Sequence, residues 1–314
     1  MTRCAILDDY QGVALDLADW SGIDAHPFHE PFASTDDLVA ALADYEIVVI
    51  MRERTPFPAS LFARLPKLRL LVTTGMRNAS IDLAAAAAHG VTVCGTGSRS
   101  TPPAELTWAL ILGLTRHLLT EATSLRTGGP WQSTLGLDLH GATLGLLGLG
   151  KIGTQVARVA QAFGMNVVAW SQNLTHERAT EAGATLAPSL DTLLEQSDIV
   201  SVHLVLSART RHLIGARELA LLRPTAYVIN TSRAAIIDQE ALVKTLSAGS
   251  IAGAGLDVFD EEPLPGDHPL RTLPNVLATP HLGYVTSGNY RTYFAEAVED
   301  IHAFLAGSPL RRLQ

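Results

Sequence analysis

Short apolar runs recur along the first third of the chain, at residues 4–7, 47–51, 68–73 and 91–94. The segments between them include stretches rich in Ala and Leu with helix-like character. Short runs of this kind are typical of buried strands, and their alternation with helices indicates βαβ units. The pattern therefore predicts a first parallel sheet.

A second and stronger series of apolar runs begins at Thr143. Its strand candidates are TLGLLGL, NVVAW, DIVSVHL, AYVINT, IAGAGLDV and VLATP, with helical segments or loops between them. A predicted helix before this series starts after Pro102 and Pro103 and carries AELTWALILGLTRHLL, residues 104–119, because proline in a first turn is a helix-start signal. Another helix is predicted from about Tyr290 to Leu305. Since no strands follow that last helix, we expect it to return to the first domain, so that the second sheet is an insertion.

The glycine pattern GLGKIG at residues 148–153 lies between the apolar run TLGLLGL and the helix-like segment TQVARVAQAFG. A GxGxxG pattern at such a strand-to-helix junction is typical of dinucleotide binding. Gly148 would permit the tight turn, Gly150 would let the backbone approach a pyrophosphate, and Gly153 would let helix and strand pack closely. The N–H groups at the helix start would face the phosphates. Packing alone is the alternative explanation of this turn.

The end of the next predicted strand lacks the acidic residue that is usual there. Ser171, Gln172 and Asn173 stand where a carboxylate would normally bind the adenosine ribose. These groups neither repel a 2′-phosphate nor supply an arginine beside it. We therefore predict an NAD(P) cofactor, with NADPH accepted and NADH also used. Arg178 or a basic residue from the loop after His203 is a candidate to reach the phosphate.

Composition and charge narrow the classes of partner. A net charge of -8 repels nucleic acid at long range, and the chain has no basic run that would neutralise phosphates. No apolar stretch reaches the roughly 18 residues of a membrane-spanning helix, and a signal-peptide pattern is missing. Cys4 and Cys94 lie in apolar runs without CxxC spacing, so we expect buried free thiols and no metal site. The sequence thus predicts a soluble, cytoplasmic protein without nucleic-acid or membrane partners.

Four short motifs in the second half of the chain carry candidate chemistry. They are Asn-Thr-Ser-Arg at 230–233, Gly-Leu-Asp-Val-Phe at 255–259, Glu-Pro at 262–263 and Pro-His-Leu-Gly at 280–283. Reducing a 2-oxo acid requires a cation for the carboxylate and carbonyl, a proton donor, and a partner that keeps the donor charged. The motifs supply one candidate for each. In order and spacing they resemble the motifs of D-isomer-specific 2-hydroxyacid dehydrogenases, and the resemblance covers nearly the whole chain.

The resemblance assigns catalytic roles to three residues. Arg233 would bind the substrate carboxylate and carbonyl, His281 would exchange a proton with the C2 oxygen, and Glu262 would stabilise the charge on His281. General chemistry agrees, because an anion beside a histidine favours imidazolium and a guanidinium suits a planar carboxylate. Taken singly, each residue could instead cap a loop, pair at the surface or lie in a turn. Ala234 follows Arg233 where the family commonly has glycine, and we expect this change to be tolerated.

The resemblance also implies binding residues for cofactor and substrate. Asp257 would hold the carboxamide side of the nicotinamide. The loop after residues 68–73 would bind the substrate carboxylate, because ligands bind at the carboxyl ends of parallel strands. The substrate residues implied are Gly75 and Met76. Arg52, just past another strand end, is added as a positive charge bordering the cleft, with a role at the surface as the alternative. The cofactor residues implied are Gly148, Gly150, Lys151, Ile152, Gly153, Ser171, Gln172, His203, Thr231, Ser232, Asp257 and Gly283.

The two strand series and the resemblance together predict an α/β protein with two doubly wound parallel-sheet domains. A Rossmann cofactor domain at residues 101–284 would be inserted into a flavodoxin-like substrate domain made of residues 1–100 and 285–314. With 314 residues, 47% of them hydrophobic, the chain is long enough for two cores. The resemblance and the apolar run at 108–119 further predict a homodimer.

The predicted function is hydride transfer between NAD(P)H and a small 2-oxo or 2-hydroxy acid of the D-specific type, such as glyoxylate or hydroxypyruvate. Formate and phosphite dehydrogenases of the same superfamily are one alternative, although formate enzymes have glutamine where this chain has Glu262. A non-catalytic NAD(H)-sensing protein that resembles the transcriptional corepressors is the other. A phosphoglycerate dehydrogenase lacks specific support in the sequence.

Overall fold

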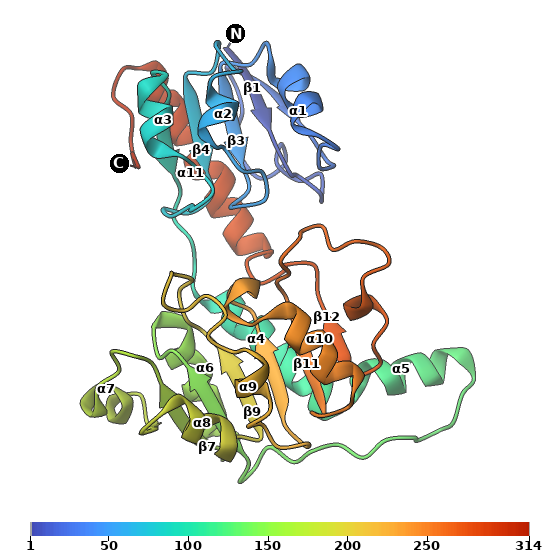
Figure 1. Ribbon diagram of the computed structural model, residues 1–314. Helices are drawn as coiled ribbons and strands as arrows, with labels where there is room; N and C mark the ends of the chain where they lie inside the picture. Colours follow the sequence, from blue (N-terminus) through green and yellow to red (C-terminus); the bar gives the residue numbers. More distant parts are fainter. Residues whose placement is uncertain (1, 314) are drawn as a thin grey trace. The chain divides into compact units, whose positions relative to one another are not determined.

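The computed structural model describes residues 2–313 and divides into two compact units (Figure 1). Unit 1 comprises Met1–Arg99 and Val285–Gln314, and unit 2 comprises Ser100–Tyr284. Each unit contains one parallel sheet. The assignment of one unit to the substrate and of the other to the cofactor stays a prediction.

Unit 1 is built on a five-stranded sheet. Its strands are β1 (Thr2–Ile6), β2 (Ile23–Pro27), β3 (Ile47–Ile50), β4 (Leu70–Thr73) and β5 (Thr92–Gly95). Its helices are α1 (Thr35–Leu42), α2 (Ala59–Phe62), α3 (Leu83–Ala88) and α11 (Ser287–Leu305). The strand order β2-β1-β3-β4-β5 is that of flavodoxin-like sheets. Strands β3 and β4 are buried along their whole length, which explains their almost purely apolar sequences.

Helices cover both faces of this sheet. Helix α11 packs against β4, and its Tyr293 and Phe294 are fully buried. A separate apolar cluster contains Leu42 of α1 and Phe62 of α2. In Figure 1, α11 lies on the face of the sheet opposite to α1 and α2. Unit 1 is therefore a doubly wound layer structure.

Strand β2 is not predicted by the apolar pattern. Its sequence, IDAHP, contains a single buried residue, Ile23, because the strand lies at the edge of the sheet next to β1. An edge strand is covered less than a central one, so its sequence carries a weaker apolar signal.

Asp300 of α11 is a buried carboxylate held by Arg311. Its Oδ1 accepts a hydrogen bond from Nε of Arg311 at 3.1 Å, while its Oδ2 has no hydrogen-bond partner among residues 2–313. Arg311 also pairs with Glu299 at 2.9 Å and with Glu296 at 3.7 Å. Burial raises the pKa of Asp300 to about 7, although Arg311 acts in the opposite direction. This carboxyl group therefore titrates near neutral pH.

Unit 2 contains a seven-stranded sheet. Its strands are β6 (Thr143–Leu147), β7 (Asn166–Trp170), β8 (Thr185–Leu186), β9 (Ile199–Val202), β10 (Tyr227–Asn230), β11 (Gly253–Leu256) and β12 (Val276–Ala278). Its helices are α4 (Thr101–Thr115), α5 (Leu118–Thr127), α6 (Lys151–Ala162), α7 (His176–Glu181), α8 (Leu190–Gln196), α9 (Ala216–Leu219), α10 (Gln239–Ser247) and the short 3-10 helices η1 (Ala234–Ile236) and η2 (Pro269–Arg271). The strand order is β12-β11-β10-β9-β6-β7-β8, and all neighbouring strands are parallel. The chain adds β7 and β8 on one side of β6 and then β9 to β12 on the other side, as in dinucleotide-binding sheets. The predicted fold class, α/β with two doubly wound parallel sheets, is confirmed.

Two apolar clusters cover the two faces of this second sheet. Along β10, Tyr227 and Ile229 belong to one cluster and Val228 belongs to the other. This alternation follows from the two-residue period of a strand. Helices α4 and α6 contribute Ile111 and Val156 to the first cluster. The sheet is thus buried on both faces, and its strand ends are left as the place for polar chemistry.

The helix predicted after Pro103 is shorter than its apolar pattern suggests. Helix α4 ends at Thr115, and His117 adopts a left-handed φ of 49° before α5 begins. Leu118, Leu119 and Leu125 of α5 have relative exposures of 56%, 59% and 64%. Figure 1 shows α5 extending away from the sheet of unit 2. The apolar sequence therefore continues onto an exposed helix.

Two further sequence predictions concern the membrane and the cysteines. Within residues 2–313, no helix combines the length and the apolar character needed to cross a bilayer. Cys4 in β1 and Cys94 in β5 are buried free thiols, as predicted. Burial raises the pKa of both thiols, to about 11 for Cys94. Neither thiol is therefore ionised at neutral pH.

Candidate active site

The glycine turn between β6 and α6 combines close backbone contacts with an open outer side. Gly148 has a φ of 100°, and a Cβ there would lie 2.8 Å from the carbonyl oxygen of His203. A Cβ on Gly153 would collide with the carbonyl oxygen of Gly148. A Cβ on Gly150, in contrast, would have no atom within 4 Å. The first and third glycines therefore fix the turn, while the second leaves space above it.

The start of helix α6 fits the pyrophosphate of a dinucleotide. Gly150 is the N-cap residue, and no side chain caps the first-turn amides. Lys151 and Ile152 form the beginning of this 12-residue helix. Uncapped N–H groups and the positive end of the helix dipole attract phosphate. The open space at Gly150 lies at this same helix end, so the turn has room for the group that its charge would attract.

Three of the predicted cofactor residues, His203, Thr231 and Ser232, directly follow the neighbouring strands β9 and β10. The hydroxyl of Ser232 donates a hydrogen bond to the carbonyl oxygen of Leu204 at 2.6 Å, which ties the two loops together. Nε2 of His203 lies 2.9 Å from Oγ of Ser201. Burial lowers the pKa of His203 to about 4, so this ring is neutral at physiological pH.

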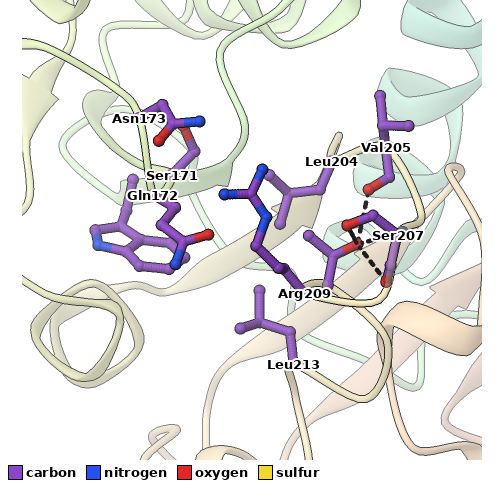
Figure 2. A pocket seen from close by; sticks show the side chains of 10 residues that line it. Ser171, Gln172, Asn173, Leu204, Val205, Ser207, Arg209 and Leu213 are labelled. Carbon is purple, nitrogen blue, oxygen red and sulfur yellow. Dashed lines mark hydrogen bonds between the residues drawn. The ribbon is translucent and has the colours of Figure 1, made fainter.

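Ser171 and Gln172 follow β7 and line a cavity of about 390 Å³ together with Asn173 (Figure 2). The opposite wall is formed by the loop after β9, residues 204–213. This loop brings Arg209 into the lining. The sequence predicted Ser171 and Gln172 as cofactor residues, but it did not single out Arg209.

Arg233 lies between the end of β10 and the start of η1. The amide nitrogen of Asn230 donates to the carbonyl oxygen of Arg233 at 3.0 Å, and the amide oxygen of Asn230 accepts from the backbone N–H of Ser232 at 3.0 Å. Nη1 of Arg233 donates to the carbonyl oxygen of Ser232 at 2.8 Å. The buried Asn230 thus fixes the backbone that carries the arginine. Ala234 begins η1 with a negative φ, so no glycine is needed there.

His281 and Glu262 are in direct contact. Nδ1 of His281 lies 2.6 Å from Oε2 of Glu262, and Oε1 of the same carboxylate accepts the backbone N–H of Phe259 at 2.9 Å. The two side chains are 22% and 29% exposed, so water reaches the pair only in part. The ring of His281 also meets the ring of Tyr284 edge-on, with centroids 5.5 Å apart. The structure therefore brings together the predicted acid and the predicted anion.

The backbone of His281 is unusual for a residue with a side chain. Its φ is 54°, in the left-handed region that favours glycine. Such conformations cost energy and are found where surrounding contacts enforce them, often at functional sites.

Asp257, directly after β11, supplies those contacts. Its side chain is fully buried, and its carboxylate accepts hydrogen bonds from Thr279 Oγ1 at 2.7 Å, from Leu282 N at 2.7 Å and from Gly283 N at 2.8 Å. Burial raises the pKa of Asp257, and these hydrogen bonds act against that rise. The donors lie on both sides of His281. Asp257 therefore anchors the segment that carries the histidine.

Two threonines contribute to this region without having been predicted. Thr279 donates to Asp257, and Thr107 of α4 lies 2.8 Å from the hydroxyl of Thr231. Thr279 stands two residues before His281, so its position beside the histidine motif is the only sequence signal for it. For Thr107 we find no sequence signal, because its partner is more than one hundred residues away.

The predicted substrate residues lie in unit 1. The N–H of Gly75 donates to Oγ1 of Thr96 at 3.0 Å, and a Cβ on Gly75 would collide with the guanidinium of Arg52. The N–H of Arg52 donates to Oγ1 of Thr74 at 2.9 Å. Met76 is 44% exposed. Arg52, in the loop after β3, therefore lies against Gly75 in the loop after β4.

Comparison with known proteins bears on the region that holds these motifs. Residues 108–283 match the family model described as D-isomer specific 2-hydroxyacid dehydrogenase, NAD binding domain. The chain belongs to this dehydrogenase family. The matched residues include the glycine turn, Arg233, Glu262 and His281. The predicted family and the predicted enzyme class, a D-2-hydroxyacid dehydrogenase, are therefore confirmed, and of the predicted NAD(P) cofactor the family model supports NAD(H).

Individual relatives of this dehydrogenase agree with the assignment. It is 41% identical over 256 residues to a glyoxylate reductase of Aeropyrum pernix, which covers 79% of this chain and 76% of the relative. It is 34% identical over 275 residues to a D-3-phosphoglycerate dehydrogenase of Methanocaldococcus jannaschii, and there the match covers 87% of this chain but 52% of the relative. A crystal structure of a phosphoglycerate oxidoreductase from Vibrio cholerae has a TM-score of 0.94 and 36% identity, covering 98% of this chain and 100% of that one.

Proposed function

We propose that this dehydrogenase reduces a small 2-oxo acid to the 2-hydroxy acid, of D configuration where the product is chiral. The contact of His281 with Glu262 at 2.6 Å carries the proposal, because it supplies a proton donor next to an anion. The similarity to the Aeropyrum pernix glyoxylate reductase favours a small substrate. Glyoxylate and hydroxypyruvate are the first candidates.

The proton path follows from the bond that Glu262 makes. Reduced nicotinamide, when bound, supplies a hydride to C2 of the substrate. Since Nδ1 of His281 bonds to Glu262, Nε2 is the ring atom that remains to protonate the C2 oxygen. His281 then becomes neutral and Glu262 stays ionised. In the oxidative direction, Nε2 takes the hydroxyl proton back.

We assign the substrate carboxylate and carbonyl to Arg233 of unit 2. A hydrogen bond from Asn230 holds the backbone of Arg233 in place. The guanidinium of Arg233 can offer two parallel N–H groups to a planar carboxylate. In unit 1, the proposed substrate residues are Gly75 and Met76, through their backbone, and Arg52, through its side chain. Gly75 and Met76 follow β4 and Arg52 follows β3, and strand ends of a parallel sheet are the expected place for ligand-binding loops.

We assign the cofactor to the strand ends of unit 2. The pyrophosphate would meet the amides of the glycine turn, where the space above Gly150 is open. The nicotinamide would meet the loops after β10, β11 and β12. The residues proposed there are Thr231, Ser232, Asp257 and Gly283, with His203 beside the glycine turn.

A substrate panel tests the function. Purified protein is mixed with NADH or NADPH and with glyoxylate, hydroxypyruvate, pyruvate or phenylpyruvate, and nicotinamide absorbance is followed. Oxidation of 3-phosphoglycerate is assayed in parallel, because one similar protein is named D-3-phosphoglycerate dehydrogenase and another phosphoglycerate oxidoreductase. We expect turnover of at least one unphosphorylated acid and chiral products of D configuration.

The alternatives give different outcomes in the same assays. Formate or phosphite oxidation without 2-oxo acid reduction would replace the proposed function by the corresponding dehydrogenase. Nucleotide binding without turnover of any acid would favour a non-catalytic NAD(H)-sensing protein. Turnover that is unchanged in His281→Gln would remove the proposed proton donor.

We also propose that the protein is a homodimer. Leu118, Leu119 and Leu125 expose apolar surface on α5, and Trp131 and Leu135 after this helix are 80% and 94% exposed. Apolar side chains gathered on one helix and the segment beside it are typical of a surface that another protein covers. A second copy of the chain is the partner that a symmetric oligomer supplies.

A cytoplasmic location is proposed as well. It is supported by the two buried free thiols, because reducing compartments keep cysteines in this form. Fractionation of the native organism, with antibody detection of the protein, would test this location.

A further inference from the structure

The cavity beside Ser171 lies next to the glycine turn of unit 2. The N–H of Gly148 donates to the carbonyl oxygen of Trp170 at 2.9 Å, and a Cβ on Gly148 would lie 3.1 Å from the nitrogen of Leu204. Trp170 and Leu204 both line the cavity. Its volume of about 390 Å³ is that of a small-molecule site. A dinucleotide bound at the glycine turn would therefore lie next to this cavity.

The charge of the cavity wall comes from Arg209. Among the described lining residues, Arg209 is the one cation, and none is acidic. Figure 2 shows its guanidinium directed toward the side of the pocket that holds Ser171, Gln172 and Asn173. The wall thus presents a positive charge and several neutral polar groups to the same space.

Arg209 makes no hydrogen bond or ion pair with any residue of the described range 2–313. Two other arginines of unit 2 form ion pairs: Arg217 pairs with Asp191 at 2.8 Å, and Arg223 pairs with Asp198 at 3.0 Å. A guanidinium offers five N–H donors. The donors of Arg209 are therefore available to a ligand.

The loop that carries Arg209 is held by its own hydrogen bonds (Figure 2). The hydroxyl of Thr210 donates to the carbonyl oxygen of Val205 at 2.7 Å and accepts the N–H of Ser207 at 2.8 Å. The carbonyl oxygen of Ser207 accepts the N–H of Arg211 at 3.0 Å. These bonds fix the backbone on both sides of Arg209, so the fold sets the position from which its side chain extends.

We propose that Arg209, together with the polar groups of Ser171, Gln172 and Asn173, binds the 2′-phosphate of NADP(H). The inference rests on the proposed use of a nicotinamide dinucleotide. A carboxylate at the end of β7 would bind the 2′-hydroxyl and repel a phosphate, whereas Ser171 can donate to either. A planar guanidinium matches phosphate oxygens. Arg209 is thus a residue that determines cofactor choice, and it belongs to the loop after β9.

Direct binding tests this assignment without turnover. Isothermal titration calorimetry compares 2′,5′-ADP with 5′-AMP, which differ only by the 2′-phosphate, and then NADPH with NADH. For the wild type we expect tighter binding of the phosphorylated member of each pair. In Arg209→Ala, affinity for 2′,5′-ADP and NADPH should fall roughly 10- to 100-fold, the usual size of a charged hydrogen-bonded contact. Affinity for 5′-AMP and NADH should change by less than about threefold.

Matched variants separate this site from general charge effects. Arg211→Ala removes a charge two residues away that does not line the cavity, and it should leave all four affinities unchanged. Arg178 of α7, the other candidate from the sequence, does not line the cavity either, so Arg178→Ala should do the same. Ser171→Asp should weaken NADPH and 2′,5′-ADP while NADH is kept or improved, because a carboxylate repels the phosphate and accepts from the ribose diol.

The proposal is overturned if wild-type protein binds 2′,5′-ADP no more tightly than 5′-AMP, or if Arg209→Ala weakens all four ligands equally or none. A phosphate-specific loss in Arg178→Ala or Arg211→Ala in place of Arg209→Ala would also overturn it. These results are independent of the substrate assay. Phosphate-specific binding without 2-oxo acid reduction would contradict the proposed function and leave the role of Arg209 standing. Reduction with NADH and no effect of the 2′-phosphate would contradict the role of Arg209 and leave the proposed function standing.

Discussion

Oε2 of Glu262 lies 2.6 Å from Nδ1 of His281, while Oε1 of the same carboxylate accepts the backbone N–H of Phe259 at 2.9 Å. The carboxylate is therefore oriented from two sides, and it orients the imidazole in turn. A pair built in this way can be tested by removing the ring, the charge or the backbone contact separately.

His281→Gln should lower kcat by about two to four orders of magnitude, because general acid-base catalysis contributes that much. The Kd of NADH or NADPH should change little, since the substitution leaves the glycine turn intact. Steady-state kinetics and calorimetry measure the two quantities. His176→Gln, on the exposed helix α7, is the matched control and should retain normal turnover. Wild-type kcat in His281→Gln would exclude this histidine as the proton donor.

Glu262→Gln keeps an acceptor for the N–H of Phe259 but removes the anion beside His281. We expect kcat to fall by roughly 10- to 100-fold, since a charged hydrogen bond is worth about 1.5–3 kcal/mol. KM should change less, because the proposed substrate cation is Arg233. Glu261→Gln, at the exposed neighbouring position, serves as control. Equal kinetics for the two variants would mean that the contact has no part in turnover.

Arg233→Lys should impair both kcat and KM severely, because an ammonium group cannot make the two parallel bonds that a guanidinium makes to a carboxylate. The expected loss in kcat/KM is about 100-fold or more. Arg211→Lys, an exposed arginine of the same unit, should have no such effect. Near-normal steady-state parameters for Arg233→Lys would contradict the assigned role.

Asp300 should make the thermal stability of the protein pH-dependent. Burial raises its pKa from 3.8 to about 7 in the folded state, so the folded protein binds more protons than the unfolded chain between these values. Stability from this group is present below about pH 4 and is lost as the pH rises through 7. Asp300→Asn should therefore lose less Tm than the wild type between pH 5 and pH 7.5.

Glu299→Gln is the control for that experiment, because Glu299 also pairs with Arg311 but is 59% exposed. Its Tm should follow the wild-type pH dependence. Calorimetry at the two pH values measures all three proteins. If Asp300→Asn shows the same pH dependence as the wild type, the carboxyl group does not titrate in this window.

Charges on α5 should disrupt the proposed homodimer. In the double variant Leu119→Glu and Leu125→Glu, two carboxylates replace side chains that are 59% and 64% exposed. Burying such charges at an interface costs several kcal/mol, so light scattering should report a monomer. Leu15→Glu, at a side chain 46% exposed in unit 1, should leave the mass unchanged. A wild-type monomer, or a dimeric double variant, would contradict this interface.

The sequence predicted the central strands best, because a strand buried on both faces has to be apolar along its length. Strand β10 and its neighbours in the sheet are of this kind. Strand β2 was missed because it lies at a sheet edge, and β8 was missed because it is only two residues long. The break at His117 was missed because the apolar residues continue through it.

The sequence predicted the site residues that belong to short local motifs. Motif spacing named His281 and Glu262, and the structure places them in contact. The anchoring of the histidine segment by Asp257 could not be derived, because its donors come from another strand end. Arg209 was not singled out for a similar reason. It lines the same cavity as Ser171 only because the fold places β7 and β9 on either side of β6.

The contact between Asp257 and Gly283 links two positions that are distant in the sequence. The carboxylate accepts the N–H of Gly283 at 2.8 Å, and a Cβ at position 283 would lie 3.1 Å from the same oxygen. A side chain at 283 would therefore press on the group that holds its own backbone. In evolution the two positions should change together or not at all. A randomised library should be built accordingly, with 257 and 283 varied jointly, since mutating either position alone would leave the other without a compatible partner.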